Sequence, residues 1–380
     1  MICRPSVKRR LLPGAVILSI ILLSACGGQA PAGKTDVPPQ TEAATTLETT
    51  APETTARETA APPTRTITDG NGNTVTIPSE VNKIAAAGAL NQITLMLGGG
   101  DKLVATAQGV QTGFFTKVYP RIREIPAAFT GPGPGTLNME TLLKTGPEVL
   151  FGTAASDEEA EAFKSANIAV VGLKLVTTED IKNTIAMVGK ILGPEAEKKA
   201  ADFIAYYDGN IKYASDTTRA AAPVKVFIAG GDGSSGTIST TPKEDINTSY
   251  IEAAGGVNVC AATYTNGSPE VNMEQVLQWD PDVIIASSRS AYDKIIAQDS
   301  LWKDLRAVKG KSVYLNPKGV YLWSVRSAEG ALQPLWLAKT LHPELCQALD
   351  MKQKVREFYK TYYYYDVTDA DLEEILNPKK

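Results

Sequence analysis

Histidine is almost absent from this chain of 380 residues, which has a single one, His342. Zinc and manganese sites are usually built from several imidazoles or thiolates, so the sequence excludes a naked site of that kind. Haem held by Met and His is disfavoured for the same reason. His342 lies in Thr340-Leu341-His342-Pro343 at an expected helix end, where a cation suits the helix dipole, and we interpret it as structural.

An excess of positive charge is also missing. The chain has 38 Lys and Arg against 42 Asp and Glu, a formal net charge of -4. A phosphate-binding surface normally shows a basic excess, so nucleic acid is not expected as a partner.

Two catalytic signatures are lacking as well. No Gly-x-Ser-x-Gly elbow occurs, and the glycine-rich run 230–236 is not followed by Gly-Lys-Ser/Thr, so neither a serine hydrolase nor a phosphate-binding loop is indicated. A hydrolase using Glu140 and Glu274 as a carboxylate pair would need them roughly 5 to 10 Å apart.

The N-terminus reads as an export signal. Basic residues (Arg4, Lys8, Arg9, Arg10) precede the apolar run 11–23, which is too short to span a bilayer comfortably. The run ends in Leu23-Ser24-Ala25-Cys26-Gly27, which resembles the bacterial lipobox, where a diacylglycerol is attached to the Cys thiol. We expect lipidation at Cys26; the alternative is an ordinary cleaved signal with an incidental Cys.

The four cysteines do not form a disulfide framework. Cys3 leaves with the signal and Cys26 takes lipid, so only Cys260 and Cys346 remain, which is too few. Cys260 is predicted to be a small buried residue. Whether it pairs with Cys346 stays open.

Beyond the lipobox, the chain divides by composition. The stretch to about residue 64 is rich in Thr, Pro and Ala and has hardly any large apolar residues, so it cannot offset the entropy of ordering. From there, short β-rich runs alternate with amphipathic segments, which predicts parallel α/β sheets. A long helical stretch interrupts this alternation near its middle and predicts a helix that joins two lobes. The expected divisions are a signal peptide (1–25), a disordered tether (26–64), an N-terminal lobe (65–193), a linking helix (194–220) and a C-terminal lobe (221–380).

An internal repeat supports two similar lobes. Asn138-Met139-Glu140 leads to Pro147-Glu148 and an apolar strand, and Asn272-Met273-Glu274 leads to Pro281-Asp282 and another, at the same interval. In each copy the Asn is a natural N-cap and the Glu lies in the first turn, which the helix dipole favours. On this evidence alone, the motif fits a capped surface helix without a function.

The order of these features resembles the class III substrate-binding proteins of ABC importers. The resemblance extends from about Arg65 to Pro378. It is carried by the lipobox, the 69–73 hairpin turn, both copies of the repeat, Tyr250-Ile251-Glu252-Ala253-Ala254-Gly255-Gly256 and the closing Glu357-Phe358-Tyr359. It implies two Rossmann-like lobes joined by a long rigid helix, modest closure, and a ligand cleft between the lobes.

The resemblance also implies roles for residues. Glu140 and Glu274 would pair with arginines on the two permease subunits. Cleft loops would offer ligand contacts, for which the candidates are Tyr321, Trp323, Arg326, Asn91, Gln108 and Arg289. The alternative for the loop 321–326 is that Trp323 packs in the C-terminal lobe and Arg326 bonds a neighbouring loop.

The sequence therefore predicts a monomeric lipoprotein on the outer face of the cytoplasmic membrane, without enzymatic activity, metal site or cofactor of its own. It would deliver a small ligand to an ABC permease dimer and its ATPase. A ferric siderophore is the first expectation, so the ligand itself would be a metal chelate. A corrinoid, haem and molybdate or tungstate are the alternatives. A cell-surface hydrolase and a sensory or adhesion lipoprotein with a dead cleft are more remote ones.

Overall fold

The computed structural model describes residues 63–131, 136–152, 156–297 and 300–378. The chain divides into two units, Met1–Thr59 and Ala60–Lys380, and the description concerns the second. The predicted signal peptide, Cys26 and the predicted tether up to residue 62 lie outside the described residues. Thr64, the last residue assigned to the tether, is the first residue of β1.

The folded part opens with the predicted hairpin. Strands β1 (Thr64–Thr68) and β2 (Thr74–Pro78) pair antiparallel, which confirms the prediction. Asp69 shapes the turn, because its Oδ1 accepts from the amides of Asn71 (2.9 Å) and Asn73 (2.8 Å). Gly72 takes a φ of 87°, a left-handed conformation that glycine adopts without a Cβ penalty.

The N-terminal lobe is built on a five-stranded parallel sheet of order β5-β4-β3-β6-β7. Its central strands β3 and β6 are apolar because both faces of the sheet are covered. The strands are β3 (Ile84–Ala86), β4 (Leu103–Ala107), β5 (Ala127–Phe129), β6 (Val149–Phe151) and β7 (Ala169–Val171). The helices are α1 (Leu90–Met96), α2 (Phe115–Val118), α3 (Met139–Thr145), α4 (Asp157–Ser165) and α5 (Thr178–Leu192).

The C-terminal lobe has a four-stranded parallel sheet of order β10-β8-β12-β13 and a small antiparallel ribbon of β9 and β11. The strands are β8 (Val224–Ala229), β9 (Ile238–Ser239), β10 (Gly256–Asn258), β11 (Glu270–Val271), β12 (Val283–Ala286) and β13 (Val313–Leu315). The helices are α7 (Ile246–Ala253), α8 (Met273–Trp279), α9 (Arg289–Ile295), α10 (Arg306–Lys309), the 3₁₀ turn η4 (Ala328–Leu332) and α11 (Gln333–Leu341).

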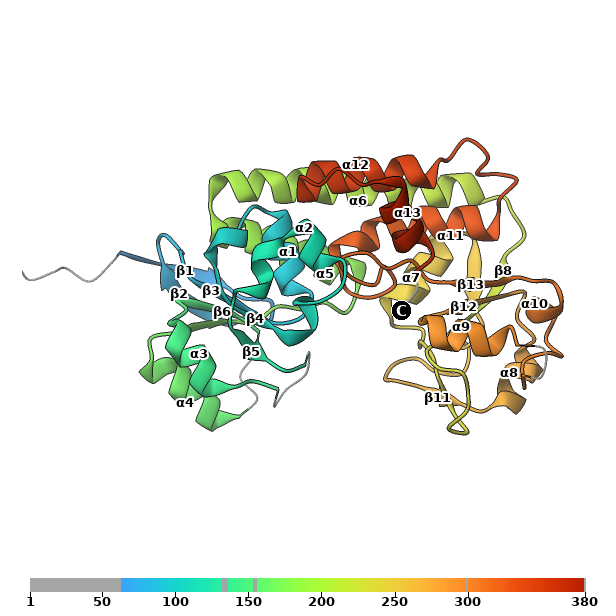
Figure 1. The fold of residues 1–380 in the computed structure, drawn as a ribbon, viewed down its shortest axis with the longest axis horizontal. Helices are drawn as coiled ribbons and strands as arrows, with labels where there is room; N and C mark the ends of the chain where they lie inside the picture. The colour runs from blue at the N-terminus through green and yellow to red at the C-terminus, as the bar shows by residue number, and fades with distance from the viewer. Residues whose placement is uncertain (1–62, 132–135, 153–155, 298–299, 379–380) are drawn as a thin grey trace, which may run out of the picture. The chain divides into compact units, whose positions relative to one another are not determined.

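The long helix α6 (Pro194–Thr218) stands between the two sheets in the chain and packs against α5 on one side and α7 and α11 on the other. Pro194 occupies its first turn, where a missing N–H is tolerated. Helix α12 (Met351–Tyr363) lies along α6 (Figure 1), with Phe203 and Tyr362 ring centroids 5.0 Å apart. Two parallel sheets flanked by helices confirm the predicted fold class.

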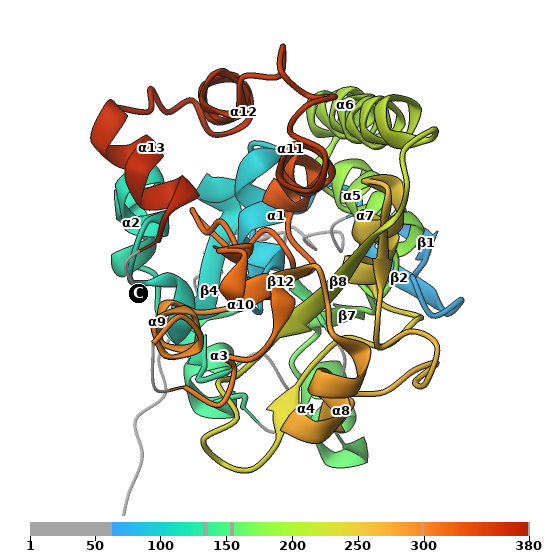
Figure 2. The same ribbon diagram turned by 90° about the vertical axis from the view of Figure 1, so that its right-hand side faces the viewer.

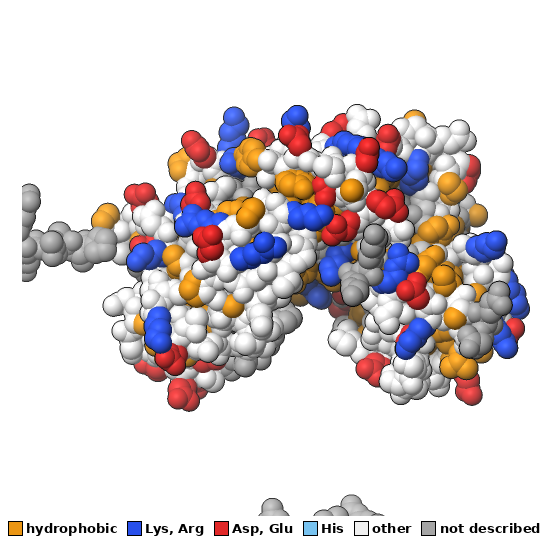
Figure 3. Space-filling model, viewed as in Figure 1, with side chains coloured by type: hydrophobic (Ala, Val, Ile, Leu, Met, Phe, Trp, Pro, Cys, Tyr) orange, Lys and Arg blue, Asp and Glu red, His pale blue; other side chains and the backbone are white. Residues whose placement is uncertain are grey.

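The last helix, α13 (Asp369–Leu376), begins with the capping box of Thr368 and Asp371. Figure 2 draws it beside α2 of the N-terminal lobe, and Lys117 of α2 pairs with Asp371 and Glu374 of α13. Among the residues described, no helix is long and apolar enough to cross a membrane. Acidic and basic side chains are interspersed on the face drawn in Figure 3.

Candidate functional site

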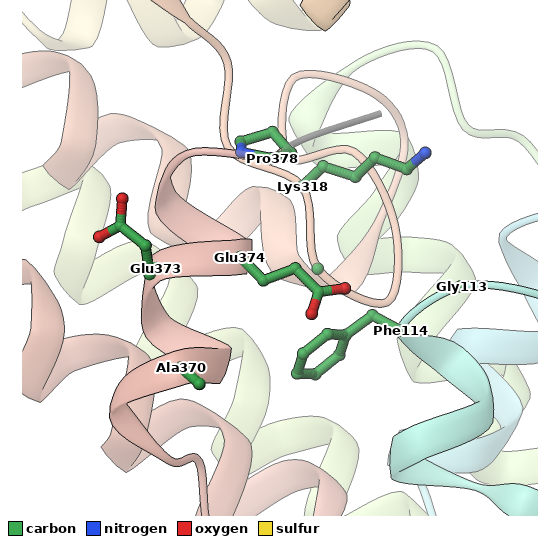
Figure 4. Close-up of a pocket in the computed structure, with 8 residues that line it drawn as sticks. Gly113, Phe114, Lys318, Ala370, Glu373, Glu374 and Pro378 are labelled. Atoms are coloured by element: carbon green, nitrogen blue, oxygen red, sulfur yellow. The ribbon is translucent and has the colours of Figure 1, made fainter.

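A pocket of about 640 Å³ lies where the C-terminal segment meets both lobes (Figure 4). A volume of this size accommodates an ordinary small-molecule ligand. Four segments provide its lining: Gly113 and Phe114 before α2, Lys318 and Gly319 after β13, Ala370, Glu373 and Glu374 of α13, and Pro378. Gln108, a predicted ligand contact, lies a few residues before Gly113 and Phe114, whereas no residue of α13 was among the predicted contacts.

On the wall of the pocket formed by α13, the charge of Glu374 is neutralised by an ion pair. Glu374 is ion-paired with Lys117 at 2.7 Å, and Lys117 also reaches Asp371 at 2.9 Å. The hydrogen bonds that Lys117 donates to Glu374 and Asp371 raise the pKa of Lys117. The Phe114 ring lies beside the Glu374 carboxylate, whereas the Lys318 side chain points away from it (Figure 4). Phe114 is buried, and Lys117 Nζ lies 4.8 Å from its ring centroid, so the exposed Lys318 is the side chain on this wall that a ligand could reach.

The loop 321–326 is partly buried. Trp323 is fully buried, and burial raises the pKa of the half-buried Tyr321. Arg326 keeps 46% of its side chain exposed and makes one long contact, 3.5 Å, to Asp245. This arrangement agrees with the alternative in which Trp323 packs and Arg326 bonds a neighbouring loop. Arg326 nevertheless remains accessible, and its role as a ligand contact stays a prediction.

The other three candidates occupy different surroundings. The Asn91 amide is buried and used internally, since its Nδ2 donates to the Ala86 and Gly88 carbonyls and its Oδ1 accepts from Thr106. Gln108 is exposed at the start of a 3₁₀ turn. Arg289 donates to Asn377 Oδ1 (2.8 Å) and to the Pro378 carbonyl (3.2 Å). In this structure Asn91 therefore holds a loop and Arg289 holds the C-terminal segment.

The repeated motif has the same geometry in both lobes. Asn138 Oδ1 caps α3 through the Thr141 amide, and Asn272 Oδ1 caps α8 through the Gln275 amide, each at 2.9 Å. Glu140 is exposed and pairs with Lys144 at 2.7 Å, while Glu274 is exposed in the first turn of α8. These observations confirm the predicted caps and leave both glutamates accessible.

The acid that follows each proline also has a structural role. Glu148 Oε2 accepts from the amides of Asn82 (2.6 Å) and Lys83 (3.0 Å), next to the first residue of β3. Asp282 Oδ2 accepts from the Lys225 amide (2.9 Å) in β8. In both lobes the acid therefore ties a neighbouring strand to the strand that follows the repeat, which is why the spacing recurs.

Neither metal nor thiol chemistry is indicated. Within the described ranges, no group of three or more His, Cys, Asp and Glu could hold a metal ion. Cys260 and Cys346 are buried free thiols, and burial raises the pKa of Cys260 to about 11. His342 caps the end of α11, and its Nε2 lies 3.1 Å from the Gly255 carbonyl, so its predicted helix-end position is confirmed.

Two α/β lobes joined by a long helix, with a pocket lined by segments of both lobes, have the architecture of a class of binding proteins. Residues 85–319, more than half of the chain, match the periplasmic binding protein family, and the chain belongs to it.

Known relatives agree. The molybdate-binding protein MolA of Haemophilus influenzae is 29% identical over 333 residues, which cover 79% of this chain and 91% of MolA. The structure of MolA bound to molybdate superposes with a TM-score of 0.70 at 25% identity, covering 80% of this chain and 99% of MolA. A periplasmic solute binding protein of Veillonella parvula gives a TM-score of 0.72 at 26% identity, covering 83% and 97% of the two chains. The protein is therefore a substrate-binding protein of an ABC importer, works with a permease and is not an enzyme.

Proposed function

We propose that the cargo is a tetrahedral oxyanion of the molybdate class. The observation that carries this proposal is the similarity to MolA across 91% of that protein's length. The sequence left molybdate and tungstate as alternatives to a ferric siderophore. Because MolA is a molybdate-binding protein, we propose these oxyanions first.

Arg326 is the side chain that best fits an oxyanion. Its guanidinium can offer two parallel N–H donors to a pair of oxygens. It is about half exposed, and its 3.5 Å contact with Asp245 is at the long end for a hydrogen bond. Thr241, in the segment just before Asp245, has a buried hydroxyl for which the described part of the chain provides no partner. A bound anion would accept from the Arg326 guanidinium.

A metal chelate, first of all a ferric siderophore, is the second candidate. The pocket of about 640 Å³ favours it, because that space far exceeds what one tetrahedral anion fills. The exposed Lys318 would suit the anionic groups of an organic chelator. A corrinoid and haem are also large organic ligands, and the titration described below includes both.

Two further parts of the function remain proposals. The chain would be anchored by lipid on Cys26 to the outer face of the cytoplasmic membrane. Glu140 and Glu274 would meet basic sites on the two permease subunits, because they are exposed at equivalent places on two similar lobes.

The cargo is tested by isothermal titration of residues 60–380 with molybdate, tungstate and sulfate, and with a ferric siderophore, cobalamin and haem. We expect saturable binding of molybdate and tungstate at micromolar concentration or below. Arg326→Gln should weaken that binding about tenfold or more, since a charge-assisted bidentate contact is worth at least about 1.4 kcal/mol.

The matched control is Arg219→Gln, an exposed arginine just beyond the end of α6, which should leave binding unchanged. Binding of the siderophore with no response to either oxyanion would replace the first candidate by the second. No saturable binding of any of the six would favour the dead-cleft alternative.

A further inference from the structure

A completely buried carboxyl lies where three segments distant in sequence meet. Glu329 in η4 is 0% exposed. Its Oε2 accepts from Gln92 Nε2 (3.0 Å) and from the Tyr321 amide (2.6 Å). Its Oε1 accepts from the Val320 amide (3.2 Å) and from the Tyr359 hydroxyl. Four donors therefore converge on two oxygens, which matches the accepting capacity of an ionised carboxylate.

The donors come from both lobes. Gln92 belongs to α1 of the N-terminal lobe, 237 residues away from Glu329 in the sequence, and Tyr359 belongs to α12. The side chain of Gln92 is bonded at both ends, because its Oε1 accepts from the Ala328 amide at 2.9 Å. Gln92 and Glu329 thus form a buried polar link between α1 and the segment 320–329.

The residues around this link are buried and closely packed. A Cβ on Gly319 would collide with the Tyr359 hydroxyl and with Glu329 Oε1, so glycine is required for the approach of the backbone. The titratable groups that face Glu329 are Tyr359 and Tyr363 of α12. Burial raises the pKa of Glu329 to about 7, against the lowering effect of the hydrogen bonds it accepts.

We propose that Glu329 is a positioning residue of the ligand site, which fixes the root of the loop 321–326 to helix α1 of the N-terminal lobe. The two amides it holds, Val320 and Tyr321, begin the loop that carries Arg326. Because Gln92 connects the same carboxyl to the other lobe, the loop follows that lobe when the angle between the lobes changes. The link to the cargo rests on the proposed function, whereas the link between loop and lobe does not.

A structural role alone would not call for this chemistry. A buried charge is expensive to desolvate, and apolar side chains of similar volume often give equal or greater stability. A fully satisfied polar network instead fixes one geometry. A carboxyl that accepts from the backbone of the ligand loop and from the opposite lobe is suited to setting the orientation of that loop.

Amide hydrogen exchange of the full chain tests the positioning role without a ligand. In Glu329→Gln, which keeps one accepting oxygen, and in Gln92→Leu, we expect exchange protection at Val320 and Tyr321 to fall about tenfold or more. Asp69→Asn is the control, because Asp69 is also a buried carboxyl that accepts backbone amides but lies in the hairpin turn. Unchanged protection in both variants would overturn the proposal.

The molybdate titration adds a pH profile. Protonation turns charge-assisted bonds into neutral ones, which are about half as strong. Affinity in the wild type should therefore fall severalfold as the pH is lowered from 8 to 5.5, and this dependence should be absent in Glu329→Gln. Equal pH profiles would contradict the positioning role. Failure of the wild type to bind molybdate would count against the proposed cargo only, and the exchange measurement would still decide the role of Glu329.

Discussion

At the scale of single residues, the raised pKa of Glu329 predicts how the stability of the fold depends on pH. Ionisation of Glu329 strengthens its bonds to the loop 321–326, but it lowers the free energy of unfolding. Its pKa in the folded protein, about 7, lies above the ordinary value of 4.5. The folded state therefore binds the proton more tightly than the unfolded state, and the free energy of unfolding decreases as the pH rises from about 4.5 to 7. The change amounts to roughly 3 kcal/mol for a shift of this size.

Urea unfolding of the wild type and Glu329→Gln at pH 5 and pH 8 measures this effect. The wild type should lose roughly 3 kcal/mol relative to the variant between the two pH values, because Gln carries no titrating proton. A difference between the two proteins that stays constant with pH would show that Glu329 does not titrate in this range.

The sequence revealed some of these residues and not others. It indicated the loop 321–326 from its aromatic and cationic residues, and the N-caps Asn138 and Asn272 from local preferences. It did not indicate Glu329, because glutamate is rarely buried and its partner Gln92 is 237 residues away. Asn91 and Arg289 are predicted contacts because they lie in expected cleft loops, but a sequence does not show that neighbours in space already use their polar groups.

At the scale of elements, helix α13 ties the end of the chain to both lobes. Lys117 of α2 pairs with Asp371 and Glu374, and Arg289 of α9 holds the residues just after the helix. Asp371 is nearly buried, and with four hydrogen bonds opposing the effect of burial its pKa is lowered to about 2. Its contribution to stability is therefore present above its ordinary pKa and disappears as the pH falls through about 2.

Lys117→Met removes the cation from this contact and leaves Asp371 without its ion partner. We expect a loss of about 1 kcal/mol in the free energy of unfolding at neutral pH, since Lys117 is 42% exposed and solvent screens the pair. Lys360→Met is the control, because Lys360 and Asp366 are exposed and 3.7 Å apart. Denaturant unfolding measures the free energy of unfolding of both variants. Equal losses would mean that the Lys117 contact stabilises the fold no more than an exposed ion pair does.

The same helix shows which elements can be predicted locally. The Asn-Met-Glu repeat is a short-range signal, and α3 and α8 begin where it predicts. The capping box of Thr368 and Asp371, which begins α13, is a signal of the same short range. The return of α13 to Phe114 and Lys117 involves a sequence separation of about 250 residues and has no local signal. For this reason the sequence did not predict the part of the pocket wall that comes from α13 and Pro378, which is half of the lining residues.

At the scale of the whole molecule, the sequence predicted the two lobes because the repeat and the alternation of strands and helices agree with one another. Two similar lobes with an exposed first-turn glutamate each suit a partner with two similar basic sites, and the docking proposal follows from that symmetry. We expect the full loss of transport only when both glutamates are replaced, since a single remaining contact would still orient one lobe on the permease.

Uptake in cells that carry the cognate permease tests this proposal. Glu140→Ala with Glu274→Ala should leave cargo affinity unchanged and reduce transport at least tenfold, with smaller losses for each single variant. The matched control is Glu158→Ala with Glu195→Ala, because both residues are exposed in the first turn of helices outside the repeat. Cys26→Ser, which should move the protein from the membrane to the soluble fraction, separates the loss of anchoring from the loss of docking. Full transport by the Glu140 and Glu274 double variant would refute the docking role, because the two lobes would then engage the permease through other surfaces.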